Sequence, residues 1–308
     1  MKIIITGSLG HIGSFLIKDF ATAYPDSKIL MIDNLMTQRY ASLFDLPQGP
    51  IYSFIDQDII NFDLESILNS NDIVIHLAAI TDAAGSFNKA EELEKNNFTA
   101  TEKIAKACLI KKARLITLSS TSVYGTQNLI VAENCSPDEL KPQSPYATTK
   151  LKEEKLVTDL CVNEGLRAVI CRFGTIFGIS TGMRFHTAVN KFCWQAVMKQ
   201  PITVWKTAYN QKRPYLDLKD ASNAFKHIIS NDLFNGEIYN ILTLNATVKE
   251  IVDIIQEQIP DLEIKYVDNK IMNQLSYEVS NTKFINTGFE FVGNLQKSIE
   301  ETINLLPK

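Results

Sequence analysis

The most constraining feature stands at the start of the chain, where a strand-like run leads directly into three spaced glycines. The run at residues 2–6, which is β-branched from Ile3 to Thr6, is followed by Gly7-Ser8-Leu9-Gly10-His11-Ile12-Gly13, and an amphipathic stretch comes next. In a βαβ unit, this spacing allows a tight turn, close approach of the backbone to a pyrophosphate, and close helix–strand packing. The helix N-terminus then offers N–H groups and a positive dipole to the phosphates. We therefore predict a dinucleotide-binding loop that uses Gly7, Gly10, His11, Ile12 and Gly13.

Short β-branched runs alternate with longer amphipathic stretches through the first two thirds of the chain. We expect strands at residues 2–6, 28–32, 51–55, 72–77, 114–119 and 167–172, with helices at 11–22, 63–69, 90–111 and 145–165. This alternation predicts an α/β fold, a Rossmann-type doubly wound parallel sheet with helices on both faces.

After about residue 173 the alternation loosens. A helix is expected at 185–199, and a second one at 219–230 follows Arg213-Pro214-Tyr215-Leu216-Asp217. We expect a dinucleotide-binding domain over residues 1–173, to which the chain returns at about 213–241. Residues 174–212 and 242–308 are expected to form a smaller C-terminal substrate-binding lobe.

The bulk composition excludes several classes of partner. Of the 308 residues, 45% are hydrophobic, and the formal net charge is −4, so no basic field is present for nucleic acid or an anionic membrane surface. No apolar run reaches the roughly 18 residues of a membrane span, and the first apolar run is too short for a signal peptide. The five scattered cysteines favour free thiols in a reducing cytoplasm.

The second expected strand ends at Asp33-Asn34, about twenty residues after the last glycine. An acidic side chain there accepts hydrogen bonds from the adenosine ribose and repels the additional phosphate of NADP, which favours NAD. Two further segments should lie at the same carboxyl edge of the sheet, Asp58-Ile59 and Leu77-Ala78-Ala79. The four histidines share no metal-ligand spacing, so no metal is expected and His76 is interpreted as structural.

A pair of residues suited to proton transfer follows the fifth expected strand, which ends in Ser119 and Ser120. Ser144 is a plausible N-cap and Pro145 a natural first helical residue, so Tyr146 and Lys150 lie four apart on one helix face. A free tyrosine has a pKa of about 10, and a nearby ammonium or the positive nicotinamide ring favours its phenolate. Lowering the pKa of Tyr146 to neutrality would take roughly 4 kcal/mol. Ser120 can orient the same substrate oxygen.

Together these motifs resemble the extended short-chain dehydrogenase/reductase family, in its NAD-dependent sugar epimerase/dehydratase group. The segments 172–178 and 213–220 also look like family motifs. The resemblance implies that Ser120, Tyr146 and Lys150 are catalytic and that a nucleotide-diphosphate sugar binds in the smaller lobe. It also implies cofactor contacts for Asn97, Ser119, Phe173, Tyr146 and Lys150, and substrate contacts for Ser120, Thr121, Thr175, Asn190 and Arg213. In particular, Arg213 resembles the arginine that meets the substrate diphosphate.

Three departures from the family pattern limit which reactions and substrate contacts this chain can share with the family. Thr121 and Ser122 stand where 4,6-dehydratases usually carry Asp-Glu, and decarboxylating members carry a glutamate at the position of Ser122. Thr175 stands where many members have an asparagine that contacts the substrate. We therefore predict a nucleotide-sugar epimerase, with a 4-keto nucleotide-sugar reductase using NAD(P)H as the alternative and a non-catalytic NAD-binding protein as a third reading. A homodimer through the helices at 90–111 and 145–165 is also expected.

Overall fold

The strand-like runs pair into one seven-stranded parallel sheet. The computed structural model describes residues 1–81, 87, 90–125, 130–268 and 276–306. The strand order is β11-β7-β5-β4-β1-β2-β3, and every neighbouring pair is parallel. The strands are β1 (Lys2–Thr6), β2 (Lys28–Asp33), β3 (Ile51–Asp56), β4 (Ile73–His76), β5 (Arg114–Ser120), β7 (Ala168–Phe173) and β11 (Ile238–Ile241). The predicted fold class is confirmed, and β11 is an edge strand that the sequence did not reveal.

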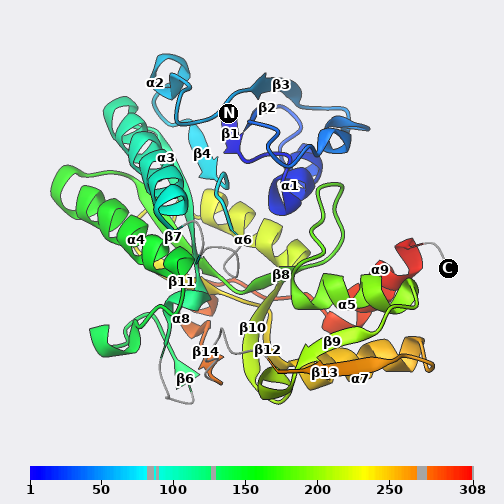
Figure 1. Cartoon of the computed structure of the whole chain (residues 1–308). Helices are drawn as coiled ribbons and strands as arrows, with labels where there is room; N and C mark the ends of the chain where they lie inside the picture. The colour runs from blue at the N-terminus through cyan, green and yellow to red at the C-terminus, as the bar shows by residue number, and fades with distance from the viewer. Residues whose placement is uncertain (82–86, 88–89, 126–129, 269–275, 307–308) are drawn as a thin grey trace.

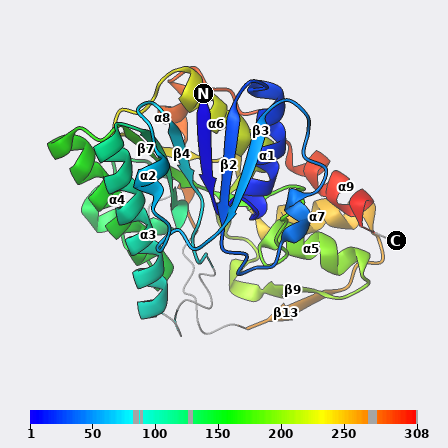
Figure 2. The same cartoon turned by 90° about the horizontal axis from the view of Figure 1, so that it is seen from above.

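Helices cover both faces of this sheet, as Figure 2 shows. One face carries α1 (His11–Ala23) and α6 (Leu218–Ser230), and the other carries α3 (Ala90–Lys111) and α4 (Pro145–Glu164). The short α2 (Leu64–Ile67) packs beside α3. Side chains of β1 alternate between the layers, with Ile3 and Ile5 in the core under α1 and Ile4 in the core under α3. Burial on both faces explains why the central strand β1 is apolar from Ile3 to Ile5.

The order of the strands reverses between β1 and β4, since the chain runs outward to β2 and β3 on one side and to β5 and β7 on the other. In an open parallel sheet this reversal leaves a crevice at the carboxyl ends of the strands, where ligands bind. The ends of β1, β2, β4 and β5 all meet at that edge, so the topology alone places the predicted site there.

A smaller lobe with its own apolar core lies beside the carboxyl edge (Figure 1). Phe177, Phe192, Ile251 and Ile299 are among its buried side chains. Its strands are β8 (Thr175–Phe177), β10 (Lys212–Asp217) and β12 (Leu244–Thr247) in one sheet, and β9 (Ile202–Trp205) with β13 (Ile264–Val267) in another. Its helices are α5 (Ala188–Val197), α7 (Val248–Gln258) and α9 (Leu295–Leu305).

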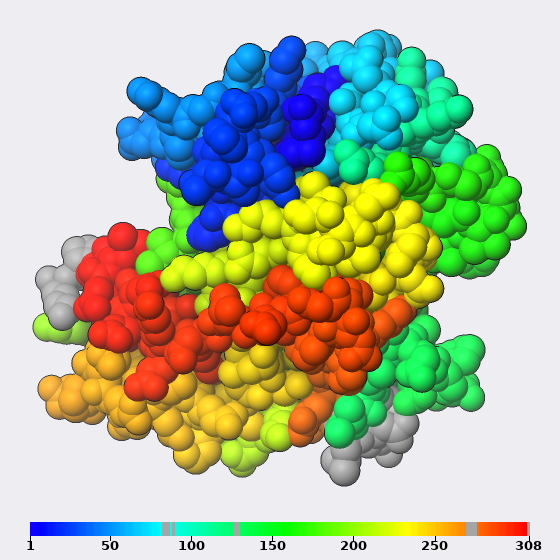
Figure 3. Space-filling view, turned by 180° about the vertical axis from the view of Figure 1, so that it is seen from behind, coloured from blue at the N-terminus to red at the C-terminus, as the bar shows by residue number. Residues whose placement is uncertain are grey.

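The return of the chain to the large sheet differs in detail from the expected one. The strand β10 pairs with β8 and β12 in the lobe, so the return consists of α6 and β11. Figure 3 shows this segment as a yellow band between the N-terminal half and the C-terminal segments. Three short elements, β6 (Ile130–Val131), β14 (Glu278–Val279) and α8 (Thr282–Ile285), complete the described structure. In the part of the chain that the structure describes, no helix has the length and apolarity to cross a membrane.

Candidate active site

A cavity of about 680 Å³ opens at the carboxyl edge of the sheet, between the sheet and the smaller lobe. Most of the residues predicted from the sequence line it. These are Gly7, Gly10, His11, Ile12, Gly13, Asp33, Asn34, Asp58, Ile59, Leu77, Ala78, Ala79, Ser119, Ser120, Tyr146, Lys150, Phe173 and Thr175. The fold thus gathers residues from separate stretches of sequence around one space.

The glycine loop is shaped by close packing on both sides. Gly7 has φ +64°, and a Cβ there would lie 2.6 Å from the backbone nitrogen of Ala78. A Cβ on Gly13 would lie 2.5 Å from the carbonyl oxygen of Ser8. The N-terminus of α1 begins at Gly10 with no side-chain cap and no acidic residue in its first turn. Its N–H groups and dipole therefore suit an anionic group such as a pyrophosphate.

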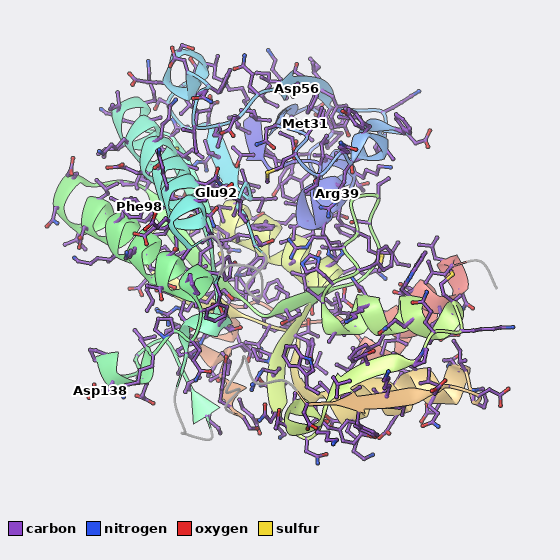
Figure 4. All side chains as sticks on the ribbon, in the orientation of Figure 1. Met31, Arg39, Asp56, Glu92, Phe98 and Asp138 are labelled. Carbon is purple, nitrogen blue, oxygen red and sulfur yellow. The ribbon has the colours of Figure 1, made fainter. Side chains whose placement is uncertain are left out.

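The carboxylate of Asp33 is held at the cavity wall by two backbone amides. Its oxygens accept hydrogen bonds from Leu9 N at 3.0 Å and Leu35 N at 2.9 Å. Arg39 lines the same end of the cavity and lies next to α1 in Figure 4. Burial lowers the pKa of the Arg39 guanidinium, and the negative charge of Asp33 raises it by a smaller amount. Sequence reasoning missed Arg39, because nothing in its local spacing connects it with the glycine loop.

Tyr146, Lys150 and Ser120 meet at the other end of the cavity. Ser144 Oγ accepts from Ala147 N at 3.2 Å, so the predicted N-cap of α4 is confirmed. The ammonium of Lys150 lies 5.9 Å from the centre of the Tyr146 ring. Ser120 Oγ accepts from the backbone nitrogen of Ser122 at 3.1 Å and from its hydroxyl at 2.9 Å. Since both bonds use Ser120 as the acceptor, its own hydrogen can be donated to a substrate oxygen.

In the chain without a cofactor, the ammonium of Lys150 does not by itself bring the pKa of Tyr146 below its usual value. Burial raises the pKa of Tyr146, and the ammonium of Lys150 lowers it by less. The carboxylate of Glu153 raises the pKa further, while Arg184 lowers it. The net direction is upward. From the sequence alone Lys150 is an uncompensated cation, whereas in the fold that cation is bonded to a carboxylate.

A buried ionic network supports the strand end that carries the serines. Arg172 donates to both oxygens of Glu154, from Nε at 2.8 Å and from Nη2 at 2.7 Å. Ser119 donates to Glu154 at 2.5 Å, and Arg172 also donates to the hydroxyl of Tyr124 at 2.8 Å. Because each charge is paired and bonded, the network can be buried without a large penalty.

Two predicted residues act on the cavity through the backbone of others. Asn97 accepts from Ile80 N at 2.8 Å and donates to Ile80 O at 2.9 Å, and Ile80 itself lines the cavity. Asn190 donates to Arg184 O at 3.0 Å and accepts from Gly178 N at 3.3 Å. Both side chains are buried. Their predicted direct contacts with cofactor and substrate stay predictions.

Thr121 and Arg213 are not among the residues that line the cavity. The hydroxyl of Thr121 donates to Phe173 O at 3.2 Å. The guanidinium of Arg213 lies 5.2 Å from the centre of the Tyr277 ring and donates to Lys212 O at 2.9 Å. The predicted contact of Arg213 with a substrate diphosphate therefore stays a prediction. For residues 267–274 the sequence suggests no role, and residues 269–274 of that stretch lie outside the described residues.

The segment that follows β8 is hydrogen-bonded to the start of α1 and so connects the lobe to the glycine loop. His11 Nε2 donates to Gly178 O at 2.7 Å, Ser180 donates to His11 O at 2.8 Å, and the backbone nitrogen of Gly182 donates to Ser14 at 2.8 Å. Burial lowers the pKa of His11 to about 4. Farther along, Arg184 lines the cavity and donates to the Thr81 hydroxyl.

His76, the last residue of β4, lines the cavity, and its interpretation as a structural residue stays a prediction. It hydrogen-bonds the Thr6 hydroxyl through Nδ1 at 2.8 Å. Burial, followed by the ammonium of Lys150, lowers the pKa of His76 to about 3, so the ring is neutral at physiological pH. Across the described ranges, no group of His, Cys, Asp and Glu is arranged to hold a metal.

Comparison with known families identifies the group to which this site belongs. The sequence model described as "NAD dependent epimerase/dehydratase family" matches residues 3–241. The chain belongs to this family. The resemblance drawn from the glycine loop and the Tyr146/Lys150 pair is thereby confirmed, and the predicted cofactor agrees with the NAD dependence of the family.

Similar proteins fall among sugar-nucleotide enzymes. The chain is 28% identical over 315 residues to an Arabidopsis thaliana trifunctional UDP-glucose 4,6-dehydratase/UDP-4-keto-6-deoxy-D-glucose 3,5-epimerase/UDP-4-keto-L-rhamnose-reductase, covering 98% of the chain and 46% of that protein. The chain thus spans about half the length of these first relatives. An uncharacterized UDP-glucose epimerase of Bacillus subtilis is 29% identical over 269 residues, covering 83% of the chain and 82% of that protein.

Solved structures of the family share the architecture over the whole chain. A UDP-glucuronic acid 4-epimerase from Bacillus cereus, in complex with UDP-glucuronic acid and NAD, has a TM-score of 0.86 at 25% identity, covering 99% of this chain and 98% of that one. A UDP-N-acetylglucosamine 4-epimerase from Methanobrevibacter ruminantium has a TM-score of 0.86 at 24% identity, covering 98% and 97%. The latter shows the fold alone.

Proposed function

We propose that this protein is an NAD-dependent nucleotide-sugar epimerase that transiently oxidises a sugar hydroxyl carbon. The observation that carries the proposal is the convergence of Ser120, Tyr146 and Lys150 on the same cavity as the glycine loop and Asp33. A loop that only bound a dinucleotide would not need a proton-transfer pair beside it. This arrangement favours an enzyme over a non-catalytic NAD-binding protein.

In the proposed reaction, Tyr146 takes the proton of the sugar hydroxyl and later returns it. Ser120 donates a hydrogen bond to the same oxygen and orients it, and Lys150 supplies the nearby positive charge. When bound, NAD supplies the hydride chemistry, since a nicotinamide ring can accept a hydride from the sugar carbon and give it back. Return of the hydride to the opposite face of the keto sugar would leave that carbon inverted.

The residues that follow Ser120 argue against loss of water. Thr121 is buried and donates to the backbone of Phe173, and Ser122 is a hydroxyl bonded to Ser120. Neither can act as a carboxylic acid or a carboxylate base. Although some relatives are named dehydratases, the chemistry available at positions 121 and 122 favours epimerisation.

The identity of the substrate can be tested with the purified native protein. Mass spectrometry of released ligand should detect NAD(H), and a panel of UDP- and dTDP-sugars should include one pair that interconverts without net consumption of cofactor. We would abandon the proposal if the protein carried no NAD(H) and interconverted no sugar pair. A Tyr146→Phe variant serves as the matched inactive control.

A reductase of a 4-keto nucleotide sugar is the second candidate. The Arabidopsis relative carries a UDP-4-keto-L-rhamnose-reductase in its name, alongside two other activities. Such an enzyme would use the same three residues but would consume reduced cofactor stoichiometrically. Loss of the absorbance of the reduced nicotinamide on addition of a keto sugar would favour the reductase, and catalysis without net loss would favour the epimerase.

We also propose that the protein is a cytoplasmic homodimer. The helices α3 and α4 pack side by side on one flank of the molecule (Figure 1), and in the resembling family such a pair forms a four-helix bundle across a two-fold axis. The five cysteines are all free, which fits a reducing compartment. Light scattering that detects only monomers would refute the dimer.

A further inference from the structure

Two consecutive glutamates of α4 are buried behind the reactive pair, and their partners differ. Glu153 is 3% exposed and Glu154 is 5% exposed. Arg172 binds Glu154 through two hydrogen bonds. Glu153 accepts instead from Lys150 Nζ at 2.8 Å and from the Thr101 hydroxyl at 3.0 Å, both at Oε2. Within the described part of the chain its Oε1 is buried with no hydrogen-bond partner.

The ammonium of Lys150 therefore interacts with two neighbours, the carboxylate of Glu153 and the ring of Tyr146. This ammonium is 2.8 Å from the carboxylate of Glu153 and 5.9 Å from the centre of the Tyr146 ring. The carboxylate of Glu153 is therefore a hydrogen-bonded partner of the ammonium. An ammonium that is already offset by a carboxylate favours a phenolate less than an uncompensated one does. Burial alone would lower the pKa of Lys150, yet Glu153 and then Tyr146 and Glu154 raise it, so Lys150 stays charged.

The two buried ion pairs beside the site are each balanced when Tyr146 is neutral. Lys150 offsets Glu153 on α4, and Arg172 on β7 offsets Glu154. A phenolate at Tyr146 would add a negative charge to this balanced set, which is costly in a buried place. From other elements, His76 on β4 faces Lys150 as a neutral ring. Arg184, between β8 and α5, acts on Tyr146 as a cation that favours the phenolate.

We propose that Glu153 is a positioning residue that offsets the charge of Lys150, so that Tyr146 keeps its proton until a positive nicotinamide ring enters the cavity. This inference rests on the proposed function of Tyr146 as acid/base. Its consequence is that the protonation of Tyr146 follows the redox state of the cofactor. Tyr146 becomes a base beside the oxidised ring, and it holds the proton ready for return beside the neutral reduced ring.

The decisive experiment measures the titration of Tyr146 itself. Tyrosine labelled with ¹³C at Cζ reports the phenol-to-phenolate change by NMR, and Tyr146→Phe assigns the signal. In Glu153→Gln, which keeps the size and removes the charge, we expect the pKa of Tyr146 to fall by on the order of one pH unit in the absence of cofactor. Saturating NAD⁺ should lower the Tyr146 pKa in the wild type, and with NAD⁺ bound the pKa should be lower still in Glu153→Gln.

Two further variants control for loss of charge and for structural damage. Glu94→Gln removes an exposed carboxylate of α3 that pairs with Lys152, and it should leave the titration of Tyr146 unchanged. Glu153→Asp retains the charge and should keep the pKa of Tyr146 near the wild-type value. If Glu153→Gln does not fold, Glu153→Met removes the same charge without leaving a buried amide to satisfy, and it should also lower the pKa of Tyr146.

An unchanged Tyr146 titration in a folded, uncharged Glu153 variant would overturn the inference. The inference would also be overturned if Glu94→Gln shifted the pKa of Tyr146 as far as Glu153→Gln does. Because this readout needs no sugar, it separates the two proposals. A protein that turns over no nucleotide sugar but shows the shift refutes the proposed reaction and supports the role of Glu153. An active epimerase whose Tyr146 pKa does not shift in Glu153→Gln supports the proposed reaction and refutes the role of Glu153.

Discussion

A glycine of the smaller lobe lies where no side chain fits, against the cofactor loop. A Cβ on Gly182 would lie 2.2 Å from the carbonyl oxygen of Leu9 and 2.6 Å from that of Gly10. Both obstacles are backbone atoms, so a small rotation of a side chain cannot relieve the overlap. A Gly182→Ala substitution must therefore displace either the glycine loop or the segment that follows β8.

The expected cost of Gly182→Ala is that of overpacking a close contact, about 1–3 kcal/mol. The loop carries the N-terminus of α1, which begins at Gly10. If the glycine loop is the part that is displaced, NAD binding must return the loop to its original geometry, and the free energy of overpacking is then subtracted from the free energy of binding. Since about 1.4 kcal/mol corresponds to a tenfold change in Kd, we expect NAD affinity to fall by roughly tenfold or more. Isothermal titration calorimetry with NAD⁺ measures this directly.

The matched control is Gly165→Ala at the end of α4. Gly165 has φ +79°, and a Cβ added there would meet nothing within 4 Å, so alanine costs about 1–2 kcal/mol of stability through backbone strain alone. Its NAD affinity should equal that of the wild type. If Gly182→Ala also bound NAD with wild-type affinity while losing stability, the loop would not be the part that yields, and the reasoning would be refuted.

Other variants test the reactive pair and its supports. Tyr146→Phe should lower kcat by about 10²–10⁴-fold while retaining NAD, which turnover assays and calorimetry would separate. Arg172→Met leaves Glu154 buried without its cation, and urea unfolding should reveal a loss of about 3–5 kcal/mol, most of it recovered in Arg172→Met/Glu154→Gln. The pKa of His11 is about 4 in the folded protein and 6.5 in the unfolded chain. As the pH is lowered, the unfolded chain is therefore protonated at His11 before the folded protein is. Stability should therefore fall as pH drops from 6.5 to 4, by up to about 1.4 kcal/mol per pH unit, and less steeply in His11→Gln.

Local patterns predicted the sheet, and they pointed to the glycines and Asp33 that line one cavity, because both depend on short stretches of sequence. Strand β1, the glycines after it and Asp33 lie within one βαβ unit, where spacing determines geometry. The helix α4 was likewise predicted with its N-cap Ser144, since capping is a local interaction.

Contacts between distant segments could not be predicted in the same way. Arg184 reaches the cavity only because the chain after β8 folds back onto α1 through Gly178 and Gly182. Arg213 has the expected place in sequence, yet its guanidinium lies over Tyr277 from a different segment. Such placements depend on tertiary packing, which one sequence without its relatives does not encode in any short motif.

Glu153 and Glu154 show most clearly why a motif cannot predict a whole site, since they are neighbours of the same type on one buried helix turn. A helix rotates by about 100° per residue, so adjacent side chains point to different surroundings. Glu154 therefore meets Arg172 on β7, while Glu153 meets Lys150 and Thr101. One carboxylate stabilises the strand end beneath the serines, and the other offsets the cation on which Tyr146 depends. The sequence supplies the tyrosine and lysine as a recognisable pair, but the charge that sets their balance comes from a residue that no motif distinguishes from its neighbour.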